Sequence, residues 1–354
     1  MYEKAKAIVV VKPRCAEVQE IPLPQVDEQS VVVRTTYSGI SMGTEMKVWS
    51  GLSGHLGGEL WYPLIPGYEE VGEVVHVGPK AKKTFAGETL KVGDRVMANE
   101  LRYFPEHCHA WGGQVGVAVN NPRTSPSPFD WPARIPDNVS YPEAVIAYLA
   151  TVAEKGINRV QPKPGQTILV IGAGMVGVSW MQLAKLAGCR VIAMEVNRKR
   201  CELAARFCDE MIDVHRDDPL ARLKQLTNDK MADIIVECSG NAAVVTELHK
   251  YLRDGGWAVD EPFGHIHLQG DYPWPVIIQP YQNWFTKNMN ISLTCALRPG
   301  GKERILQLIS EGKFDAKTLL QSPLTVEVPV DESPKAYHMA EESNKDIFKV
   351  IFKW

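Results

Sequence analysis

The sequence has little of what marks several large protein classes. Lysine and arginine number 39 against 42 acidic residues, for a formal net charge of −3. Without a basic block, nucleic acid is not an expected partner. No apolar run reaches the roughly 18 residues of a membrane span. The N-terminal stretch MYEKAKAIVVVKP does not have the pattern of a signal peptide. We therefore expect a cytoplasmic protein with no membrane partner.

Cysteine is scarce as well. The chain has seven cysteines, an odd number, with no C-x-x-C pair. This argues against both a disulfide framework and a four-cysteine structural zinc site. The densest group of metal-ligating residue types is the run from His107 to His109. We interpret that run as a surface turn rather than as a metal site.

What is present indicates two domains. A length of 354 residues is comfortable for two. The first third alternates β-branched runs with turns, which predicts a β-rich module; the runs are AIVVV, SVVVRTTYSG, VGEVVHVG, GDRVMAN and GQVGVAV. Helical periodicity follows near residues 137–160. Asp137, Asn138 and Ser140 are candidate caps there, and Pro142 suits the first turn.

From residue 163 onward, apolar strands alternate with helices, as in a doubly wound parallel sheet. The run TILVIGAGMVG places Gly172, Gly174 and Gly177 after a strand and at the start of a helix, with Met175 and Val176 in its first turn. In such a loop the glycines permit a tight turn, close backbone approach to a pyrophosphate, and close helix packing. The helix N-terminus favours the negative charge. We predict a Rossmann α/β domain that binds a dinucleotide.

An acid at the end of the next strand bears on which dinucleotide is bound. Glu195 stands 23 residues after Gly172, where a carboxylate accepts ribose hydroxyls of NAD and repels the 2′-phosphate of NADP. Arg198, Lys199 and Arg200 follow and keep NADP open as the alternative. We favour NAD, with Arg200 near the ribose in either case.

These motifs together resemble the medium-chain dehydrogenase/reductase superfamily of zinc-type alcohol dehydrogenases. The carriers are YSGISMGTE (37–45), PGYEEVGEVVHVG (66–78), VGDRV (92–96), KPGQTILVIGAGMVG (163–177) and VECSG (236–240). SGIS-x-GTE with PGYE is most similar to the bacteriochlorophyllide dehydrogenase-like branch. The resemblance implies a GroES-like catalytic domain in 1–150, completed by 296–354, and a Rossmann domain in 151–295. It also implies a substrate site between the domains and a homodimer paired through NISLTCALR.

The zinc ligands of that superfamily are not conserved in type here. Residue by residue, the resemblance places them at Ser41, Tyr68 and Ala147. A serine, a tyrosine and an alanine do not form the usual zinc ligand set. The four-cysteine structural lobe is also replaced, by ANELRYFPEHCHAWGG. We expect no zinc.

Without a metal, a side chain must handle the hydroxyl proton and stabilise the developing oxyanion. Tyr68 is the first candidate, because the resemblance places it against the nicotinamide; the alternative is a tyrosine that only packs in the cleft wall. Ser41 and Thr44 are candidate relays in the same turn. Glu69, like Glu45, is expected to support the site.

The resemblance also places residues along the rest of the cofactor. Cys238 and Ser239 are expected under the adenine ribose, and Gln269 and Gly270, followed by Asp271, near the nicotinamide. The backbone at the expected edge strand is expected to hold the carboxamide, through Leu293, Thr294 and Cys295. An apparent insertion near residues 255–264 is either a surface excursion or a lid.

The leading functional hypothesis is an NAD(P)-dependent oxidoreductase that interconverts a small-molecule alcohol and a carbonyl without zinc. One alternative is a zinc-free enoyl or quinone reductase. Such enzymes generally prefer NADPH, so Glu195 counts against it. The other is a dinucleotide-binding protein without turnover, which would also have lost the ligands.

Overall fold

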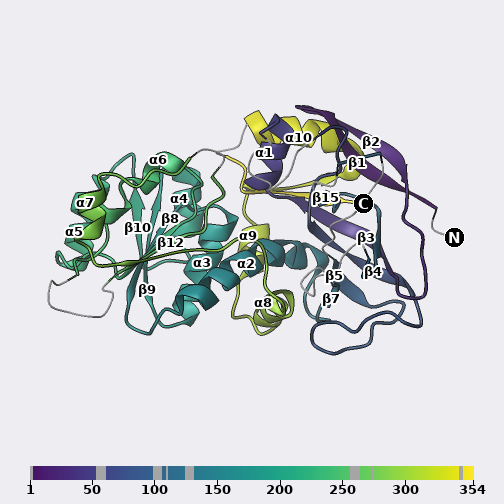
Figure 1. The fold of residues 1–354 in the computed structure, drawn as a ribbon, viewed down its shortest axis with the longest axis horizontal. Coiled ribbons are helices and arrows are strands. Elements are labelled where there is room, and N and C mark those ends of the chain that lie inside the picture. Colours follow the sequence, from purple (N-terminus) through teal and green to yellow (C-terminus); the bar gives the residue numbers. More distant parts are fainter. Residues whose placement is uncertain are drawn as a thin grey trace. The chain divides into compact units, whose positions relative to one another are not determined.

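The computed structural model describes residues 3–52, 61–98, 106–108, 111–123, 131–255, 264–272, 275–342 and 346–354. These residues form two compact units (Figure 1). One unit contains Met1–Thr151 and Leu297–Trp354, and the other contains Val152–Ala296. The predicted insertion lies largely outside the described residues.

The first unit is built on a mixed β-sheet. Its strands follow the order β14-β15-β3-β4-β5-β7, with β6 also paired to β3, and β1 and β2 form a separate antiparallel ribbon. The strand bounds are β1 Lys4–Lys12, β2 Cys15–Pro22, β3 Val31–Ile40, β4 Glu69–Val77, β5 Arg95–Ala98, β6 Val117–Asn120, β7 Ala133–Arg134, β14 Thr325–Pro329 and β15 Lys349–Lys353. The β-rich module predicted from the sequence is confirmed.

The C-terminal strand β15 pairs with both β14 and β3, so the end of the chain closes the sheet begun by its first third. The helices of this unit are α1 Thr44–Ser50, α8 Gly301–Ser310, α9 Ala316–Leu320 and α10 Ser333–Glu342, and α2 Tyr141–Val160 runs across the unit boundary. The predicted helix near 137–160 is α2. Its cap is Ser140, whose hydroxyl accepts from the Glu143 N–H while Glu143 accepts from the Ser140 N–H. This reciprocal arrangement is a capping box.

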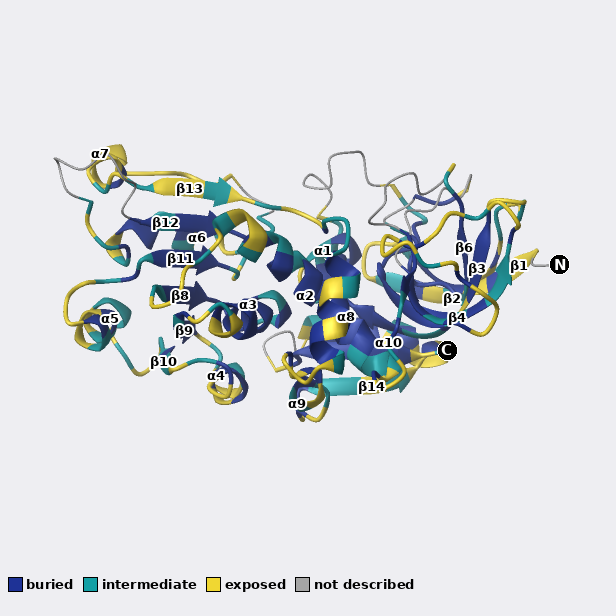
Figure 2. Ribbon diagram, turned by 90° about the horizontal axis from the view of Figure 1, so that it is seen from below, coloured by how far each residue is buried: buried dark blue, intermediate teal, exposed yellow. Residues whose placement is uncertain are grey.

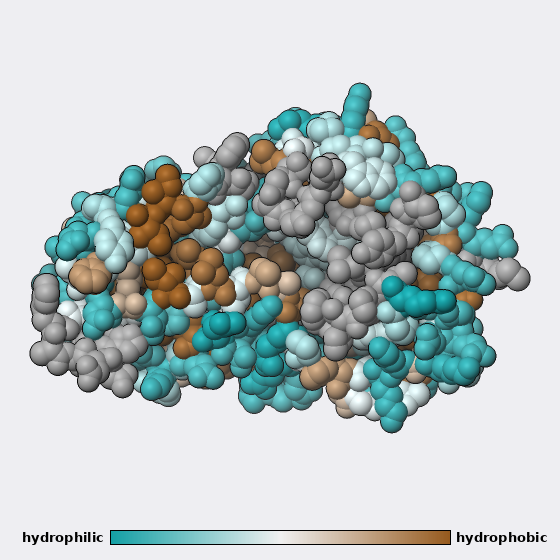
Figure 3. Space-filling view, in the orientation of Figure 1, coloured by the Kyte–Doolittle hydropathy of each residue, from teal (hydrophilic) through white to brown (hydrophobic). Residues whose placement is uncertain are grey.

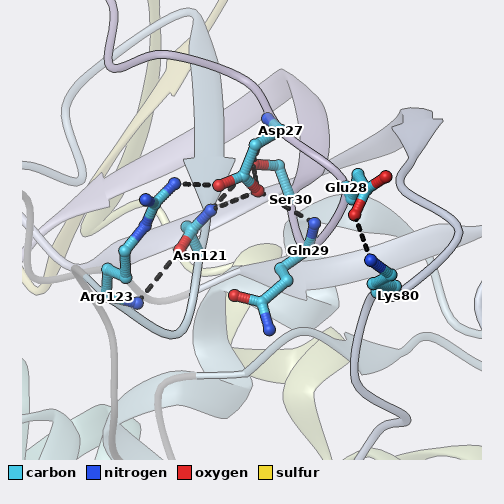
Figure 4. A network of polar contacts seen from close by, with 7 residues as sticks. All are labelled: Asp27, Glu28, Gln29, Ser30, Lys80, Asn121 and Arg123. Atoms are coloured by element: carbon cyan, nitrogen blue, oxygen red, sulfur yellow. Dashed lines mark hydrogen bonds and ion pairs between the residues drawn. The ribbon is translucent and has the colours of Figure 1, made fainter.

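A polar network anchors the turn that leads into β3 (Figure 4). Oδ1 of Asp27 accepts from the Gln29 N–H at 2.8 Å and from the Asn121 amide at 2.9 Å. The Ser30 hydroxyl accepts from the Asp27 N–H at 3.0 Å, and Glu28 pairs with Lys80 at 2.5 Å. These bonds join the start of β3 to the end of β6 and help to hold the strand that leads to the candidate site.

One core cluster of this unit surrounds the α1 segment and includes Trp49, Tyr337 and Phe352. Cys108 is part of the same cluster and is 7% exposed. The expectation of a surface turn at this position is therefore wrong for Cys108 and for its buried neighbour His107. The backbone of Cys108 forms an isolated parallel β-bridge with Leu64, and this pairing draws residues 107–108 toward the core. His109 lies outside the described residues.

The second unit is a parallel sheet with the strand order β10-β9-β8-β11-β12-β13. Its elements are β8 Thr167–Ile171, α3 Met175–Leu186, β9 Arg190–Glu195, α4 Arg198–Ala204, β10 Glu210–Asp213, α5 Pro219–Thr227, β11 Ile234–Glu237, α6 Ala242–Val245, β12 His265–Leu268, α7 Tyr281–Phe285 and β13 Asn290–Leu293. The central strands are buried, and the edge strand β13 is largely exposed (Figure 2). This order is that of a doubly wound Rossmann fold, so the predicted fold class is confirmed.

In this fold the strand order reverses between β8 and β11, and ligands bind beyond the carboxyl ends of strands at such a point. No helix in the described part of the chain is long and apolar enough to cross a membrane.

Candidate functional site

Three hydroxyl side chains of the first unit converge. Ser41 directly follows β3, Thr44 begins α1, and Tyr68 directly precedes β4. The Tyr68 hydroxyl donates to Oγ of Ser41 at 2.5 Å and is also hydrogen-bonded to the Thr44 side chain. The structure therefore brings together three of the residues predicted to act in catalysis.

Burial determines the protonation state of Tyr68. The residue is 8% exposed. Its ring stacks on Tyr148 at 4.8 Å between centroids and meets Trp111 edge-on at 5.1 Å. Desolvation raises the pKa of Tyr68 well above its ordinary value, and the nearby Glu69 raises it further. Near neutral pH the phenol therefore keeps its proton and can donate it in a hydrogen bond.

A buried carboxylate supports the turn that holds Ser41. Oε2 of Glu45 accepts from the Ser41 N–H at 3.2 Å. Oε1 accepts from the Gln114 amide at 3.1 Å and from the Tyr337 hydroxyl. Burial raises the pKa of Glu45 to about 7, although these hydrogen bonds oppose the rise. Glu45 thus titrates close to neutrality beside the hydroxyl cluster.

Glu69 is paired with a lysine from the far end of the chain. Its carboxylate contacts the ammonium group of Lys349, and both side chains are almost fully buried. Lys349 also donates to the carbonyl of Ile40 at 3.0 Å. Desolvation raises the pKa of Glu69, and Lys349 opposes that rise. The pair ties the start of β4 to the end of β3, which places Tyr68 next to Ser41.

The side chains at the three positions that the resemblance assigns to zinc are poor metal donors. Oγ of Ser41 accepts from Tyr68, Tyr68 keeps its proton because its pKa is raised, and Ala147 carries no donor and is fully buried. Zinc in proteins is bound by thiolate, imidazole and carboxylate. This set does not fit zinc.

The glycine-rich loop has the form expected for a dinucleotide. Gly172 follows β8 with a φ of +93°, a conformation that favours glycine. A Cβ at Gly177 would lie 1.9 Å from the Gly172 carbonyl oxygen. A Cβ at Gly174, by contrast, would meet nothing within 4 Å. Protein packing does not explain that glycine, and the open space at the N-terminus of α3 fits a pyrophosphate. Met175 and Val176 form the first turn of α3.

Glu195 ends β9 beside this loop. One carboxylate oxygen accepts from the Ala173 N–H at 2.7 Å, and the other accepts from the N–H groups of Val196 and Asn197 at 2.7 and 2.8 Å. A carboxylate has about four acceptor positions, so about one remains for a ribose hydroxyl. Arg200 lies in α4, where its backbone N–H donates to Asn197.

The loop after β11 lies against the glycine loop. The Cys238 N–H donates to the Ile171 carbonyl at 2.8 Å, and a Cβ at Gly172 would lie 2.9 Å from the Ser239 nitrogen. Buried Glu237 accepts from the Ser239 N–H at 2.8 Å and from the Tyr272 hydroxyl. Cys238 and Ser239 therefore line the point where the strand order reverses.

The remaining predicted cofactor residues follow the next two strands. Gln269 and Gly270 come after β12, Leu293 ends β13, and Thr294 and Cys295 follow it. With Glu195 on one side of the glycine loop, the other half of a bound dinucleotide would extend past β11 toward these strand ends. Gln269 donates to the Thr294 carbonyl at 3.1 Å, and Lys155 donates to the Cys295 carbonyl at 2.5 Å.

Sequence reasoning missed several residues that hold these sites. Gln114, Tyr337 and Lys349 support the hydroxyl cluster, and Trp180 and His267 contact Gln269. A lysine within the apolar run FKVIF was the one available signal for Lys349. No local pattern marks Gln114 or Tyr337.

Each of the two units contains a match to a known protein family. Residues 27–120 match the alcohol dehydrogenase GroES-like domain, and residues 176–260 match the zinc-binding dehydrogenase family, which together are about half of the chain. D-arabinitol dehydrogenase 1 of Uromyces fabae is 28% identical over 266 residues, covering 71% of this chain and 72% of its own length. The uncharacterized zinc-type alcohol dehydrogenase-like protein YdjJ of Escherichia coli (strain K12) is 25% identical over 350 residues, or 94% of each chain.

A solved structure, that of ECK1772 from Escherichia coli, described as an oxidoreductase/dehydrogenase of unknown specificity involved in membrane biogenesis, has the same fold. It superposes with a TM-score of 0.83 at 20% identity and covers 99% of both chains. The two domain matches and the shared fold confirm the resemblance read from the sequence. The chain belongs to the medium-chain dehydrogenase/reductase superfamily and is zinc-type alcohol dehydrogenase-like.

Proposed function

We propose that the protein is an NAD-dependent oxidoreductase that interconverts an alcohol and a carbonyl by hydride transfer without a catalytic zinc. The observation that carries this proposal is the hydroxyl cluster: Ser41 and Tyr68, two of the three positions that the resemblance assigns to zinc, are hydrogen-bonded to each other, and Tyr68 is also bonded to Thr44. Membership in a dehydrogenase superfamily supports the reaction class.

The proposed cofactor is NAD(H), which supplies or accepts the hydride. Gly174 leaves room for its pyrophosphate, Gly172 and Gly177 allow the tight loop around it, and the N-terminus of α3 favours the phosphate charge. Glu195 favours NAD over NADP, because a buried carboxylate repels a 2′-phosphate. NADP remains the alternative, with Arg198, Lys199 and Arg200 as the basic residues nearby in sequence.

In the proposed mechanism, Tyr68 donates a hydrogen bond, directly or through Ser41, to the carbonyl oxygen as negative charge develops on it. The raised pKa of Tyr68 supports donation and opposes a role as base. Reduction is therefore the easier direction near neutral pH. The alkoxide oxygen then takes the proton of Tyr68, and Thr44 relays a replacement proton to Tyr68 from solvent. Glu69 supports the turn through Lys349.

The proposed substrate is a small alcohol or carbonyl compound. The relative named D-arabinitol dehydrogenase 1 supports a polyol or ketose. An enoyl or quinone reductase is the alternative oxidoreductase, and a dinucleotide-binding protein without turnover is the alternative of another class. The protonated Tyr68 beside Ser41 favours catalysis at a carbonyl oxygen over the protein without turnover. Glu195 counts against the enoyl or quinone reductase, because such enzymes generally prefer NADPH.

A test of this proposal measures metal content and activity on one preparation. We expect NADH oxidation with a panel of ketoses and aldehydes, no stoichiometric zinc by elemental analysis, and unchanged rates after chelator treatment. One tightly held zinc per chain, with activity lost on its removal, would contradict the metal-free mechanism. NADH binding without turnover of any carbonyl would favour the non-catalytic alternative.

We further propose a homodimer, located in the cytoplasm. The edge strand β13 leaves Ile291 and Leu293 42% and 63% exposed. Nearby in sequence, Ile277, Tyr281 and Phe285 are also exposed. Figure 3 shows brown, hydrophobic surface on this unit. An exposed edge strand favours symmetric pairing with a second copy, and an apolar patch favours burial in an interface.

A further inference from the structure

A chain of hydrogen bonds in the second unit is not used by the mechanism above. It runs behind the carboxyl ends of β12 and β13 and includes the fully buried residues Trp180 and His267. Its members are joined side chain to side chain; they are His265, Ser292, His267, Gln269, Thr294 and Trp180.

The orientation of the Gln269 amide follows from its partners. The indole N–H of Trp180 can only donate, and it lies 3.2 Å from Oε1 of Gln269. The Thr294 hydroxyl donates to the same oxygen at 3.2 Å. The amide nitrogen therefore faces the Thr294 carbonyl, to which it donates at 3.1 Å. Its second N–H has no partner among the described residues.

The proton on His267 can be placed by the same reasoning. Nε2 lies 3.1 Å from Oε1 of Gln269, which only accepts, and 3.1 Å from Oγ1 of Thr294, whose own proton goes to that Oε1, so Nε2 carries the proton. Nδ1 then accepts from the Ser292 hydroxyl at 2.8 Å. The Ser292 oxygen in turn accepts from Nε2 of His265 at 2.6 Å. The bonds from His265 through Ser292 and His267 therefore all donate toward Gln269.

Two further features keep this arrangement in place. Burial lowers the pKa of His267 to about 4, and the charges of His265 and Arg159 act in the same direction. The ring is therefore neutral and has one proton to place. In helix α2, Gly156 leaves the space that the cluster fills, because a Cβ there would lie 2.3 Å from Oε1 of Gln269 and 2.4 Å from the Trp180 ring.

We propose that His267 is a positioning residue that, through its Nε2–H, holds Gln269 and Thr294 so that Gln269 presents one amide N–H to the carboxamide oxygen of the nicotinamide. This inference rests on the proposed binding of NAD(H). The topology supports it, since Glu195 and the glycine loop direct the second half of the dinucleotide toward the ends of β12 and β13.

The experiment compares NADH with ADP-ribose, which lacks the nicotinamide. His267→Asn keeps an acceptor near the Nδ1 position and loses the Nε2 donor, whereas His267→Gln keeps a donor that reaches Gln269. We expect His267→Asn to weaken NADH binding by roughly 3- to 10-fold, the effect of one lost hydrogen bond, while ADP-ribose affinity changes by less than about twofold. His267→Gln should recover most of the NADH affinity.

Equal loss of both ligands in His267→Asn, or no loss of NADH affinity, would overturn the role of His267. If the unmodified protein binds neither ligand, the proposed function itself fails. Circular dichroism and thermal unfolding establish that each variant folds. Should His267→Asn not fold, Ser292→Ala leaves Nδ1 without its donor and should produce a smaller loss, again confined to NADH.

A second measurement tests the hydrogen-bond arrangement directly and does not depend on ligand binding. Nitrogen-15 chemical shifts of the His267 ring should show the Nε2–H tautomer in the unmodified protein. The same tautomer should persist in Ser292→Ala, because Oε1 of Gln269 still accepts from Nε2–H. A proton on Nδ1 in the unmodified protein would contradict the arrangement.

Discussion

Tyr68 has the hydroxyl on which the proposed chemistry most depends. Tyr68→Phe keeps the ring against Tyr148 and Trp111 and deletes only the hydroxyl. Because loss of a general acid typically costs about 10²–10⁴-fold in rate, we expect kcat to fall by that order. NADH affinity should change by no more than about twofold. Steady-state kinetics and fluorescence titration measure the two quantities.

Tyr251→Phe, in the other unit, is the matched control and should turn over at the native rate. If Tyr68→Phe does so too, the tyrosine only packs in the wall of the site. Ser41 or Thr44 would then be the residue to replace.

Glu195 is the residue that we propose decides between the two dinucleotides. Glu195→Ala removes the acceptor for the ribose and leaves the N–H groups of Ala173, Val196 and Asn197 without their partner. We expect NADH binding to weaken by about 1–3 kcal/mol. Glu195→Gln keeps the shape of the side chain and removes its charge. Comparing it with Glu195→Ala separates the effect of charge from that of packing. Tighter binding of NADPH than of NADH by the unmodified protein would show that the choice of NAD is wrong.

Glu45 makes the stability of the fold depend on pH. Its pKa of about 7 in the folded state lies above the ordinary carboxyl value of 4.5. The folded state therefore holds the proton more tightly than the unfolded state, and the stability that this contributes is lost as pH rises from about 4.5 through 7. Between pH 5 and 8, wild type should lose about 1–3 kcal/mol relative to Glu45→Gln, measured by chemical denaturation. Parallel pH profiles of the two proteins would refute this.

At the scale of elements, the hydroxyl cluster depends on strand β15 reaching β3 and β4. Lys349 of β15 is 1% exposed and contacts Glu69, the first residue of β4. Lys349→Met leaves a buried carboxylate without its partner and should destabilise the fold by about 3–5 kcal/mol. Adding Glu69→Gln removes the unpaired charge and should recover part of the loss. A double variant no more stable than Lys349→Met would contradict this account of the pair.

The sequence predicted many of these elements because their cues are local. The glycine loop between β8 and α3, the acid that ends β9 and the candidate cap Ser140 before α2 each lie within a few consecutive residues. Edge position was harder to predict. β13 is short and alternates polar with apolar residues, and its edge position was expected from the resemblance alone.

At the scale of the whole molecule, association is the main prediction. Leu293 on the edge strand is 63% exposed, and a homodimer would bury it. Light scattering at micromolar concentration should give a dimer mass. Leu293→Lys should shift the protein toward monomer, because a lysine on an edge strand opposes pairing. Val92→Lys, at a residue 62% exposed in the other unit, is the control and should remain dimeric. If the unmodified protein is a monomer, the proposed homodimer is wrong.

The assignment to the medium-chain superfamily held for the chain as a whole, and the bacteriochlorophyllide dehydrogenase-like branch stays a prediction. Each superfamily motif is a continuous run of residues, so it can be recognised in a single sequence. A branch, like a substrate, depends on residues that line the site from several segments. Trp111 and Tyr148, which pack on Tyr68, come from different parts of the chain.

By itself, the sequence determined the Rossmann domain, the β-rich module and the glycine loop, because each depends on residues that are neighbours in the chain. Only the tertiary structure decided which side chains act together. Tyr337 and Lys349 lie about 300 residues along the chain from Glu45 and Ile40, to which they are bonded. Burial, which raises the pKa of Tyr68 and lowers that of His267, arises from packing between distant segments, and no local pattern encodes it.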